Sequence, residues 1–217
     1  MGASERRGIG PRLRGTAAAL AACLLAAGAA ADAPVRPRLL PLPDVRQTTV
    51  YACGAAALQA VLAYYGIDAR QDTLIAELGT NETVGTRWWE IVRDAEARGL
   101  RAEPRTGMAE RDLEADLDRG VPVLLAVQAW ADEPPADAAG WAARTEDGHY
   151  VVAVGYDAER FYFEDPAMFG VGYIGRAELE ARWHDFDEFG TRLEHFGIAF
   201  TRPAGPDALA ARVAPIE

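Results

Sequence analysis

The spacing of apolar residues predicts helices in the first half of the chain. Over residues 53–65 they recur at intervals of three and four, which is typical of one helix face. These residues are Leu58, Val61, Leu62 and Tyr65. Gly66 follows directly, and glycine commonly ends a helix. We predict three more helices, over residues 71–78, 86–98 and 110–119.

The second half changes to the alternating and continuously apolar patterns of strands. Residues 121–130, VPVLLAVQAW, read as a buried strand. Residues 149–157 and 160–165 form a predicted hairpin around a tight turn. A short helix is expected over 176–183 and a last strand over 195–202. Helices followed by an antiparallel sheet indicate an α+β fold, with the N-terminal helical part packed on the C-terminal sheet.

The two ends of the chain do not follow these patterns. Residues 1–31 carry four arginines and then a short apolar run ending in A-x-A, which predicts a secretory signal peptide cleaved after Ala31. Cleavage after Ala33 is an alternative. Residues 32–45 hold four prolines and form an expected extended lead-in. The predicted domain spans 46–203, and 204–217 is expected to be a loosely packed tail.

The sequence LAAC at residues 20–23 offers a second processing route. It fits a bacterial lipobox, in which Cys23 would be lipidated and would anchor the protein to a membrane. The apolar run continues past Cys23, whereas lipoproteins usually turn polar there. We therefore expect free export to the periplasm or the medium, and membrane attachment only through Cys23.

The charge balance limits the partners of the chain. Its formal net charge is −11, and residues 1–31 hold four Arg and one Glu, a net +3, so the remainder carries −14. A strongly acidic surface repels nucleic acid and anionic lipid. We expect a peptide or protein partner, no nucleic acid, no cofactor and no metal. The segment RWHDFDEFG, residues 182–190, reads as packing and turn rather than as a metal site.

Cys53 is the one cysteine outside residues 1–31, and it lies at a predicted helix start. Unpaired N–H groups and the helix dipole at that end favour the thiolate, which is the nucleophilic form. Gly54 next to it leaves room for a substrate backbone. A small, buried, inert cysteine is the alternative.

His149 and Asp165 are the candidate partners of this thiol. His149 opens a predicted strand and can accept the thiol proton. Asp165 ends the partner strand of the same hairpin, where it can orient the imidazole. His184 and His195 are rival histidines, and Asp165 before a proline is also typical of a turn.

Gln47 precedes the cysteine by six residues and can supply a side-chain amide to an oxyanion. Gly148 and Trp88 are further candidates, with Gly54, for the substrate site. The long polar segment 131–148 directly before His149 is either a lid over the cleft or a plain surface insertion.

The order Gln, Cys, His, Asp is that of papain-like cysteine peptidases. The stretches QTTVYACGAA, GHYVVAVGYD and FEDP closely resemble the bacteriocin-processing, or double-glycine, peptidases, over about residues 44–200. The resemblance implies a half-papain fold, Cys53 as nucleophile, His149 as general base and acid, Asp165 as its orienting group and Gln47 in the oxyanion hole.

One feature departs from the bacteriocin-processing members. Those members carry the domain in front of a membrane transporter, whereas this chain shows no transporter segment and an apparent export signal. It therefore resembles the stand-alone branch, and neither the double-glycine leader specificity nor ATP dependence is carried over. We predict an exported cysteine peptidase. The alternatives are a cell-envelope amidase or transpeptidase acting on peptidoglycan peptides, and a non-catalytic peptide-binding module.

Overall fold

A computed structural model describes residues 37–203 of the chain. The predicted signal peptide, Cys23, the first part of the lead-in and the C-terminal tail lie outside these residues. The helices are α1 (Cys53–Tyr64), α2 (Gln71–Glu77), α3 (Trp88–Ala97), α4 (Glu110–Asp118), α5 (Ala138–Ala142) and α6 (Arg176–Arg182). Within residues 37–203, no helix is long and apolar enough to cross a bilayer.

The main sheet has six strands in the order β1-β8-β2-β3-β4-β5, and every neighbouring pair is antiparallel. A separate hairpin pairs β6 with β7. The strands are β1 (Arg101–Arg105), β2 (Val123–Gln128), β3 (Gly148–Tyr156), β4 (Arg160–Glu164), β5 (Val171–Gly175), β6 (His184–Phe186), β7 (Arg192–Glu194) and β8 (Gly197–Thr201).

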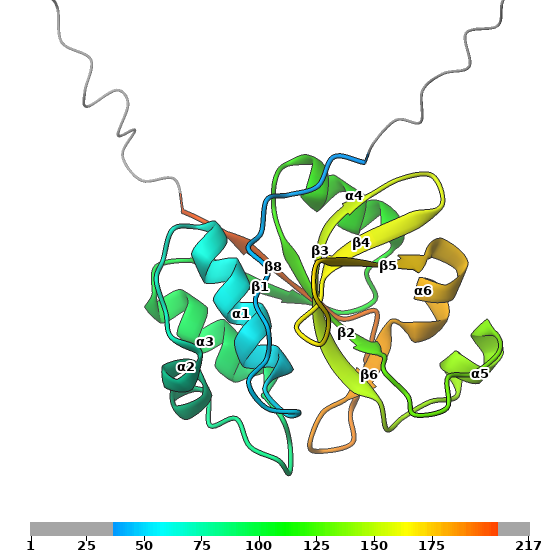
Figure 1. Ribbon diagram of the computed structural model, residues 1–217. Coiled ribbons are helices and arrows are strands. Elements are labelled where there is room, and N and C mark those ends of the chain that lie inside the picture. Colours follow the sequence, from blue (N-terminus) through cyan, green and yellow to red (C-terminus); the bar gives the residue numbers. More distant parts are fainter. Residues whose placement is uncertain (1–36, 204–217) are drawn as a thin grey trace, which may run out of the picture. The chain divides into compact units, whose positions relative to one another are not determined.

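Helices cover both faces of this sheet (Figure 1). Leu58 and Leu62 of α1 belong to one apolar core with Leu124 and Val152 of the central strands. The alternate strand residues face a second core that includes α4 and α6. Because β2 is buried on both faces, its sequence is a continuous apolar run rather than an alternating one.

The predicted α+β fold is confirmed, and every predicted helix and strand is present with ends shifted by at most two residues. The last predicted strand begins at Gly197 rather than at His195. His195 has a φ of 44°, which is incompatible with a strand, and its N–H donates to the Trp183 carbonyl at 2.9 Å. Helix α4 lies on the face of the sheet opposite to α1 and α3, a detail that the sequence pattern does not give.

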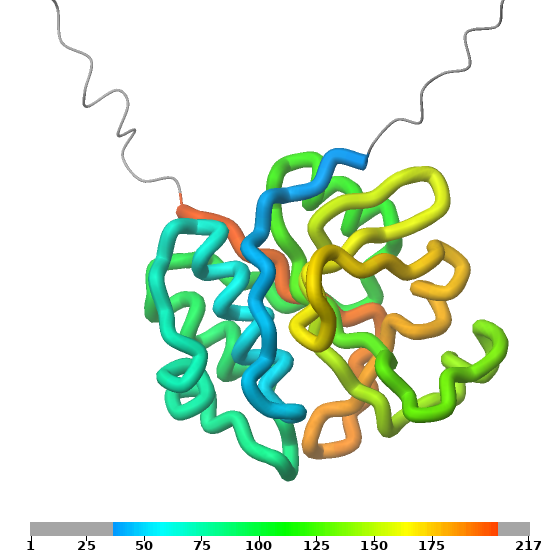
Figure 2. The backbone as a smooth tube through the Cα atoms, viewed as in Figure 1, coloured from blue at the N-terminus to red at the C-terminus, as the bar shows by residue number. Residues whose placement is uncertain are grey.

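The lead-in runs across the domain toward Cys53 (Figure 2). The Leu40 N–H donates to the Val154 carbonyl at 2.6 Å, and the Val45 N–H donates to Glu164 Oε1 at 3.1 Å. A β-carbon at Gly155 would lie 2.6 Å from the Arg38 carbonyl oxygen, so the close approach of the lead-in to β3 requires glycine there. The extended lead-in thus fixes the segment that enters α1.

Candidate active site

Cys53 is the first residue of α1, and its thiol is free and half-buried. The first N–H groups of a helix have no acceptor inside it, and the backbone N–H groups of Gly54 and Tyr150 donate to the sulfur. Burial raises the pKa of the Cys53 thiol. The hydrogen bond to His149, the positive charge of His149 and the two backbone N–H groups lower this pKa, and together they outweigh burial. The net pKa is therefore lowered from 9.0.

His149 lies near the start of β3 and is 7% exposed. Its Nε2 is 2.7 Å from Asp165 Oδ1, and its side chain also hydrogen-bonds Cys53. Burial lowers the pKa of His149, but the hydrogen bonds and charges of Asp165 and Cys53 reverse this effect and raise it above 6.5. The arrangement favours a thiolate beside an imidazolium over the neutral pair.

Asp165 follows the last residue of β4 and accepts three hydrogen bonds. Its Oδ1 accepts from His149 and from the Ala167 N–H at 2.8 Å, and its Oδ2 accepts from the Trp130 indole N–H at 3.0 Å. Burial raises the pKa of Asp165, but these donors and the His149 charge lower it overall. Continuing the Val152–Glu164 pairing by one residue places Asp165 opposite Val151, so it meets His149 diagonally.

Trp130 is a functional candidate that the sequence pattern does not reveal. It follows β2 with a φ of 62°, a conformation that non-glycine residues rarely adopt, and it is 57% exposed. Sparsely populated backbone conformations cluster at functional sites. Here the conformation accompanies the hydrogen bond to Asp165. An isolated tryptophan at a strand end carries no sequence signal for that bond.

Gln47 lies between the lead-in and α1, beside the turn that holds Asp165. Its backbone N–H donates to the Pro166 carbonyl at 3.0 Å, and its side-chain Nε2 donates to the Thr49 carbonyl at 3.0 Å. One amide N–H thus has an acceptor and the second is left over. The oxyanion role of Gln47 stays a prediction.

Cys53 and His149 line one cavity of about 90 Å³. Gly148 and Trp88 also line this cavity, and their part in binding a substrate stays a prediction. Gly54 is buried instead, and a β-carbon there would lie 2.6 Å from Thr86 Cβ. Packing against Thr86 therefore accounts for this glycine, and not the approach of a substrate.

The hairpin β6–β7 and its turn form the opposite wall of the same cavity. Arg87, directly before α3, pairs with Glu188 of the turn, with Nη2 and Oε2 2.6 Å apart. Trp89 stacks on Phe189 with ring centroids 5.9 Å apart. An ion pair and an aromatic stack thus join the hairpin to α3 across the cavity that contains Cys53.

The other two histidines have separate partners. His184 Nε2 is 2.9 Å from the Arg144 carbonyl oxygen, and His195 Nδ1 is 3.1 Å from the Met108 carbonyl oxygen. The His195 ring stacks on Trp183. Across residues 37–203, no group of three or more acidic, histidine or cysteine side chains is placed to hold a metal ion.

A second cavity, of about 430 Å³, lies on the Asp165 side of the His149–Asp165 pair. Apolar side chains dominate its walls, among them Val127, Phe163, Ile174 and both Trp130 and Trp141. The segment 131–148 contributes Ala131, Pro134, Pro135 and Trp141 to this second cavity. Its last residue, Gly148, lines the cavity of Cys53 instead. Four residues of the candidate lid segment thus line the apolar cavity, and one lines the cavity of Cys53.

Comparisons with known proteins agree with this fold. A sequence model of the Peptidase_C39 like family matches residues 39–189. No curated protein matches the chain in sequence. A putative C39-like peptidase from Bacillus anthracis has a similar structure, with a TM-score of 0.56 and 18% identity over 78% of this chain and 99% of that one.

Two further structures are domains of transporter proteins. The peptidase domain of Streptococcus ComA, a bifunctional ABC transporter, gives a TM-score of 0.54 and 21% identity, covering 73% of this chain and 97% of that one. A double-glycine motif protease from an AMS/PCAT transporter, solved with a leader peptide, gives 0.51 and 19%, covering 77% and 98%. At these identities the three structures show a shared fold, and the resemblance predicted from the motifs is confirmed.

Proposed function

Because the chain belongs to the Peptidase_C39 like family, we propose that it is an exported cysteine peptidase that hydrolyses peptide bonds through Cys53, His149 and Asp165. Family membership and the shared fold support a peptidase. The observation that carries the finer proposal is the hydrogen-bonded series from Cys53 through His149 to Asp165, in which Cys53 and His149 line one cavity. A binding module has no need of such a series.

Acylation begins from the thiolate–imidazolium pair. The Cys53 sulfur attacks the carbonyl carbon of the peptide bond, a C–S bond forms, and the carbonyl π electrons move to oxygen. First-turn N–H groups of α1 have no acceptor within the helix, and the Cys53 N–H with the spare Gln47 amide N–H would stabilise this oxyanion. Asp165 holds the imidazole in place and stabilises its positive charge.

The tetrahedral intermediate then collapses. His149 gives its proton to the leaving nitrogen, the C–N bond breaks, and an amine departs from a thioester on Cys53. Neutral His149 next takes a proton from water as the water oxygen attacks the thioester carbon. The C–S bond breaks, the acid product leaves, and the thiolate–imidazolium pair returns.

The proposed substrate is a peptide or protein, and the chemistry needs no cofactor and no ATP. The AMS/PCAT protease was solved with a leader peptide, which supports a peptide ligand for this fold. We propose export through the signal peptide of residues 1–31. The mass of the exported protein tests this, because an N-terminus at Asp32 or Pro34 fits signal cleavage, whereas a lipid on Cys23 fits the membrane-anchored alternative.

The test is the pH dependence of Cys53 alkylation by iodoacetamide, followed at Cys53 by mass spectrometry in the wild type and in His149→Ala. A lowered thiol pKa keeps the thiolate populated as the pH falls below 9.0, so the wild type should react fast at pH 6. Without His149, burial raises the thiol pKa. Because each pH unit below that pKa removes tenfold of the thiolate, the rate at pH 6 should fall by about 10²-fold or more.

His195→Ala is the matched control, since it removes the rival histidine, and it should leave the alkylation profile unchanged. A peptide library then reports hydrolysis, which His149→Ala should abolish. A slow, ordinary thiol profile in the wild type that His149→Ala does not alter would contradict the peptidase proposal and favour the binding module.

A further inference from the structure

The cavity that contains Cys53 has an acidic wall that the peptidase mechanism does not use. Asp185, Asp187 and Glu188 line it, and Arg87 is the one arginine among its lining residues. Arg87 is paired with Glu188. Asp187 Oδ1 accepts the backbone N–H groups of Phe189 and Thr191, at 2.9 and 2.8 Å, and so closes the hairpin turn.

Unlike Glu188, Asp185 has only neutral bonding partners, and unlike Asp187 it does not accept the N–H groups that close the turn. Its Oδ1 accepts a long hydrogen bond from Gln128 Nε2 at 3.3 Å, and the Phe186 backbone N–H also donates to it. Burial raises the pKa of Asp185 to about 6, while Phe186, Gln128 and the charge of His149 lower it. Around neutral pH the wall therefore presents a poorly solvated carboxylate without a bonded cation.

Asp185 also lies beside the reacting groups. Its carboxylate packs directly on the Cα of Gly148, the residue before His149, and a β-carbon at position 148 would overlap both carboxylate oxygens. A glycine at position 148 is therefore what allows an acid to approach the catalytic histidine this closely. A group of the substrate bound at Asp185 would lie within one or two residues of the bond under attack.

We propose that Asp185 binds a primary ammonium group of the substrate next to the scissile bond, supplied by a basic side chain or by a free N-terminus. This inference rests on the proposed peptidase function. A charge-assisted hydrogen bond in this partly enclosed site compensates the half-buried carboxylate and selects against neutral and acidic groups. The small cavity favours a compact ammonium over a larger, planar guanidinium.

Covalent labelling of Cys53 by three matched chloromethyl ketones tests the inference without a known substrate. Acetyl-Lys-Gly carries a side-chain ammonium, acetyl-norleucyl-Gly is its neutral counterpart, and norleucyl-Gly has a free N-terminus. The wild type should react at least about tenfold faster with one of the cationic labels than with the neutral one. Whichever cationic label is preferred identifies the source of the ammonium.

Asp185→Asn should bring that ratio close to one, because asparagine keeps the oxygen that accepts from Gln128 and loses the charge that attracts the ammonium. Asp187→Asn makes the same charge change in the same wall and should retain the preference. Asp185→Ala is a second variant, and thermal unfolding checks that each variant folds.

Two outcomes would overturn the inference. They are equal rates with all three labels in the wild type, and a cation preference that survives in both Asp185 variants. If those equal rates are fast and need His149, the peptidase proposal stands and only the role of Asp185 fails. If they are slow and His149→Ala reacts alike, the peptidase proposal fails as well.

Discussion

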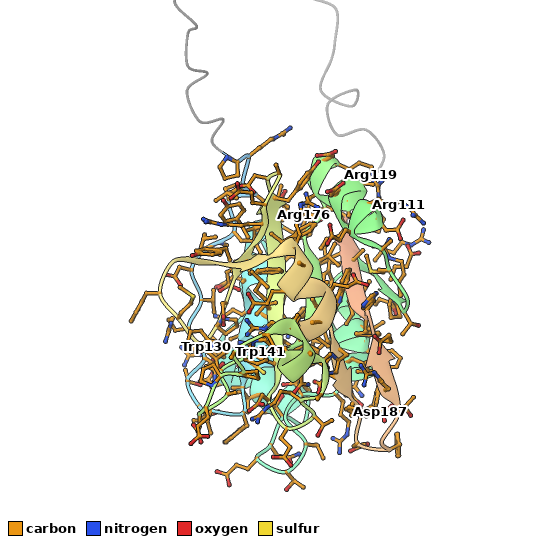
Figure 3. All side chains as sticks on the ribbon, turned by 90° about the vertical axis from the view of Figure 1, so that its right-hand side faces the viewer. Arg111, Arg119, Trp130, Trp141, Arg176 and Asp187 are labelled. Atoms are coloured by element: carbon orange, nitrogen blue, oxygen red, sulfur yellow. The ribbon has the colours of Figure 1, made fainter. Side chains whose placement is uncertain are left out.

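Two cavities meet at the hydrogen-bonded pair of His149 and Asp165, and they differ in size and chemistry. The one that contains Cys53 and His149 is narrow, about 90 Å³, and has an acidic wall. The one beside Asp165 is about 430 Å³ and mostly apolar. In Figure 3 Trp130 and Trp141 of the apolar side lie close together, well apart from Asp187 of the acidic wall.

The comparison shows that Cys53 lies on the His149 side of the His149–Asp165 pair, whereas Trp130, which donates to Asp165, lies on the other side. Cys53 and His149 line the small cavity, whereas the apolar cavity has no cysteine or histidine among its lining residues. The apolar side therefore influences the chemistry through Asp165. Trp130 connects the apolar cavity to the His149–Asp165 pair, because it lines that cavity and donates a hydrogen bond to Asp165.

Breaking the shared pair should have the largest effect. In Asp165→Ala the imidazole loses both its orienting acceptor and the charge that raises its pKa. We expect alkylation of Cys53 at pH 6, and hydrolysis of any peptide the wild type cleaves, to fall by about 10²–10³-fold.

Asp165→Asn separates the two effects, because it keeps an oxygen for His149 Nε2 and loses the charge. Its rates should lie between those of the wild type and Asp165→Ala. Glu178→Gln, which changes an acid of the apolar cavity away from His149, is the control and should react like the wild type. Wild-type alkylation at pH 6 in Asp165→Ala would mean that Asp165 is only a turn residue.

The residues of this pair could be predicted from sequence because local rules place them. A hairpin brings residues 149 and 165 onto neighbouring strands, and a helix start explains Cys53. The acidic wall could not be predicted, since β6 and β7 are three residues each and carry no clear strand pattern. β1, RAEPR, also carries no strand signal in the sequence, because it is a mostly exposed edge strand that contains a proline.

Some features depend on neighbours in space that the sequence does not show. The sequence leaves the long segment before His149 open between a lid and a plain surface insertion, and in the structure four of its residues line the apolar cavity, with Trp141 5% exposed beneath Arg182. The glycine at position 54 was assigned to substrate approach, yet it packs on Thr86. Long-range packing of this kind leaves no periodic signal in the sequence.

A smaller effect is expected when the link between the cavities is weakened. Trp130→Phe keeps an aromatic ring and removes the N–H that donates to Asp165 Oδ2. A hydrogen bond to a charged group contributes about 1.5–3 kcal/mol, and less when half exposed, so alkylation at pH 6 should fall by roughly 3–10-fold. The thermal midpoint should fall by no more than about 4 °C, since a loss of about 1 kcal/mol shifts it by about 2–4 °C at this size.

Trp141→Phe is the matched control, because it lines the same cavity but stacks on Arg182. It should leave the alkylation profile where the wild type has it. If both variants shift the pH profile equally, the apolar cavity acts through its general packing, and the hydrogen bond from Trp130 to Asp165 does not determine the reactivity of Cys53.

The smallest effect concerns the width of the cavity that contains Cys53, which the Arg87–Glu188 pair limits. The two side chains are 29% and 20% exposed, and a partly exposed ion pair of this kind is weak. Arg87→Glu or Glu188→Arg alone places like charges across the cavity. Each should speed labelling of Cys53 by a bulky peptidyl reagent about 2–5-fold relative to iodoacetamide.

The double swap restores an ion pair with reversed direction and should return this ratio toward the wild-type value. Independent, additive effects of the two swaps would show that the pair does not hold the hairpin against α3, and the narrowness of the cavity would then rest on the stacking of Trp89 with Phe189.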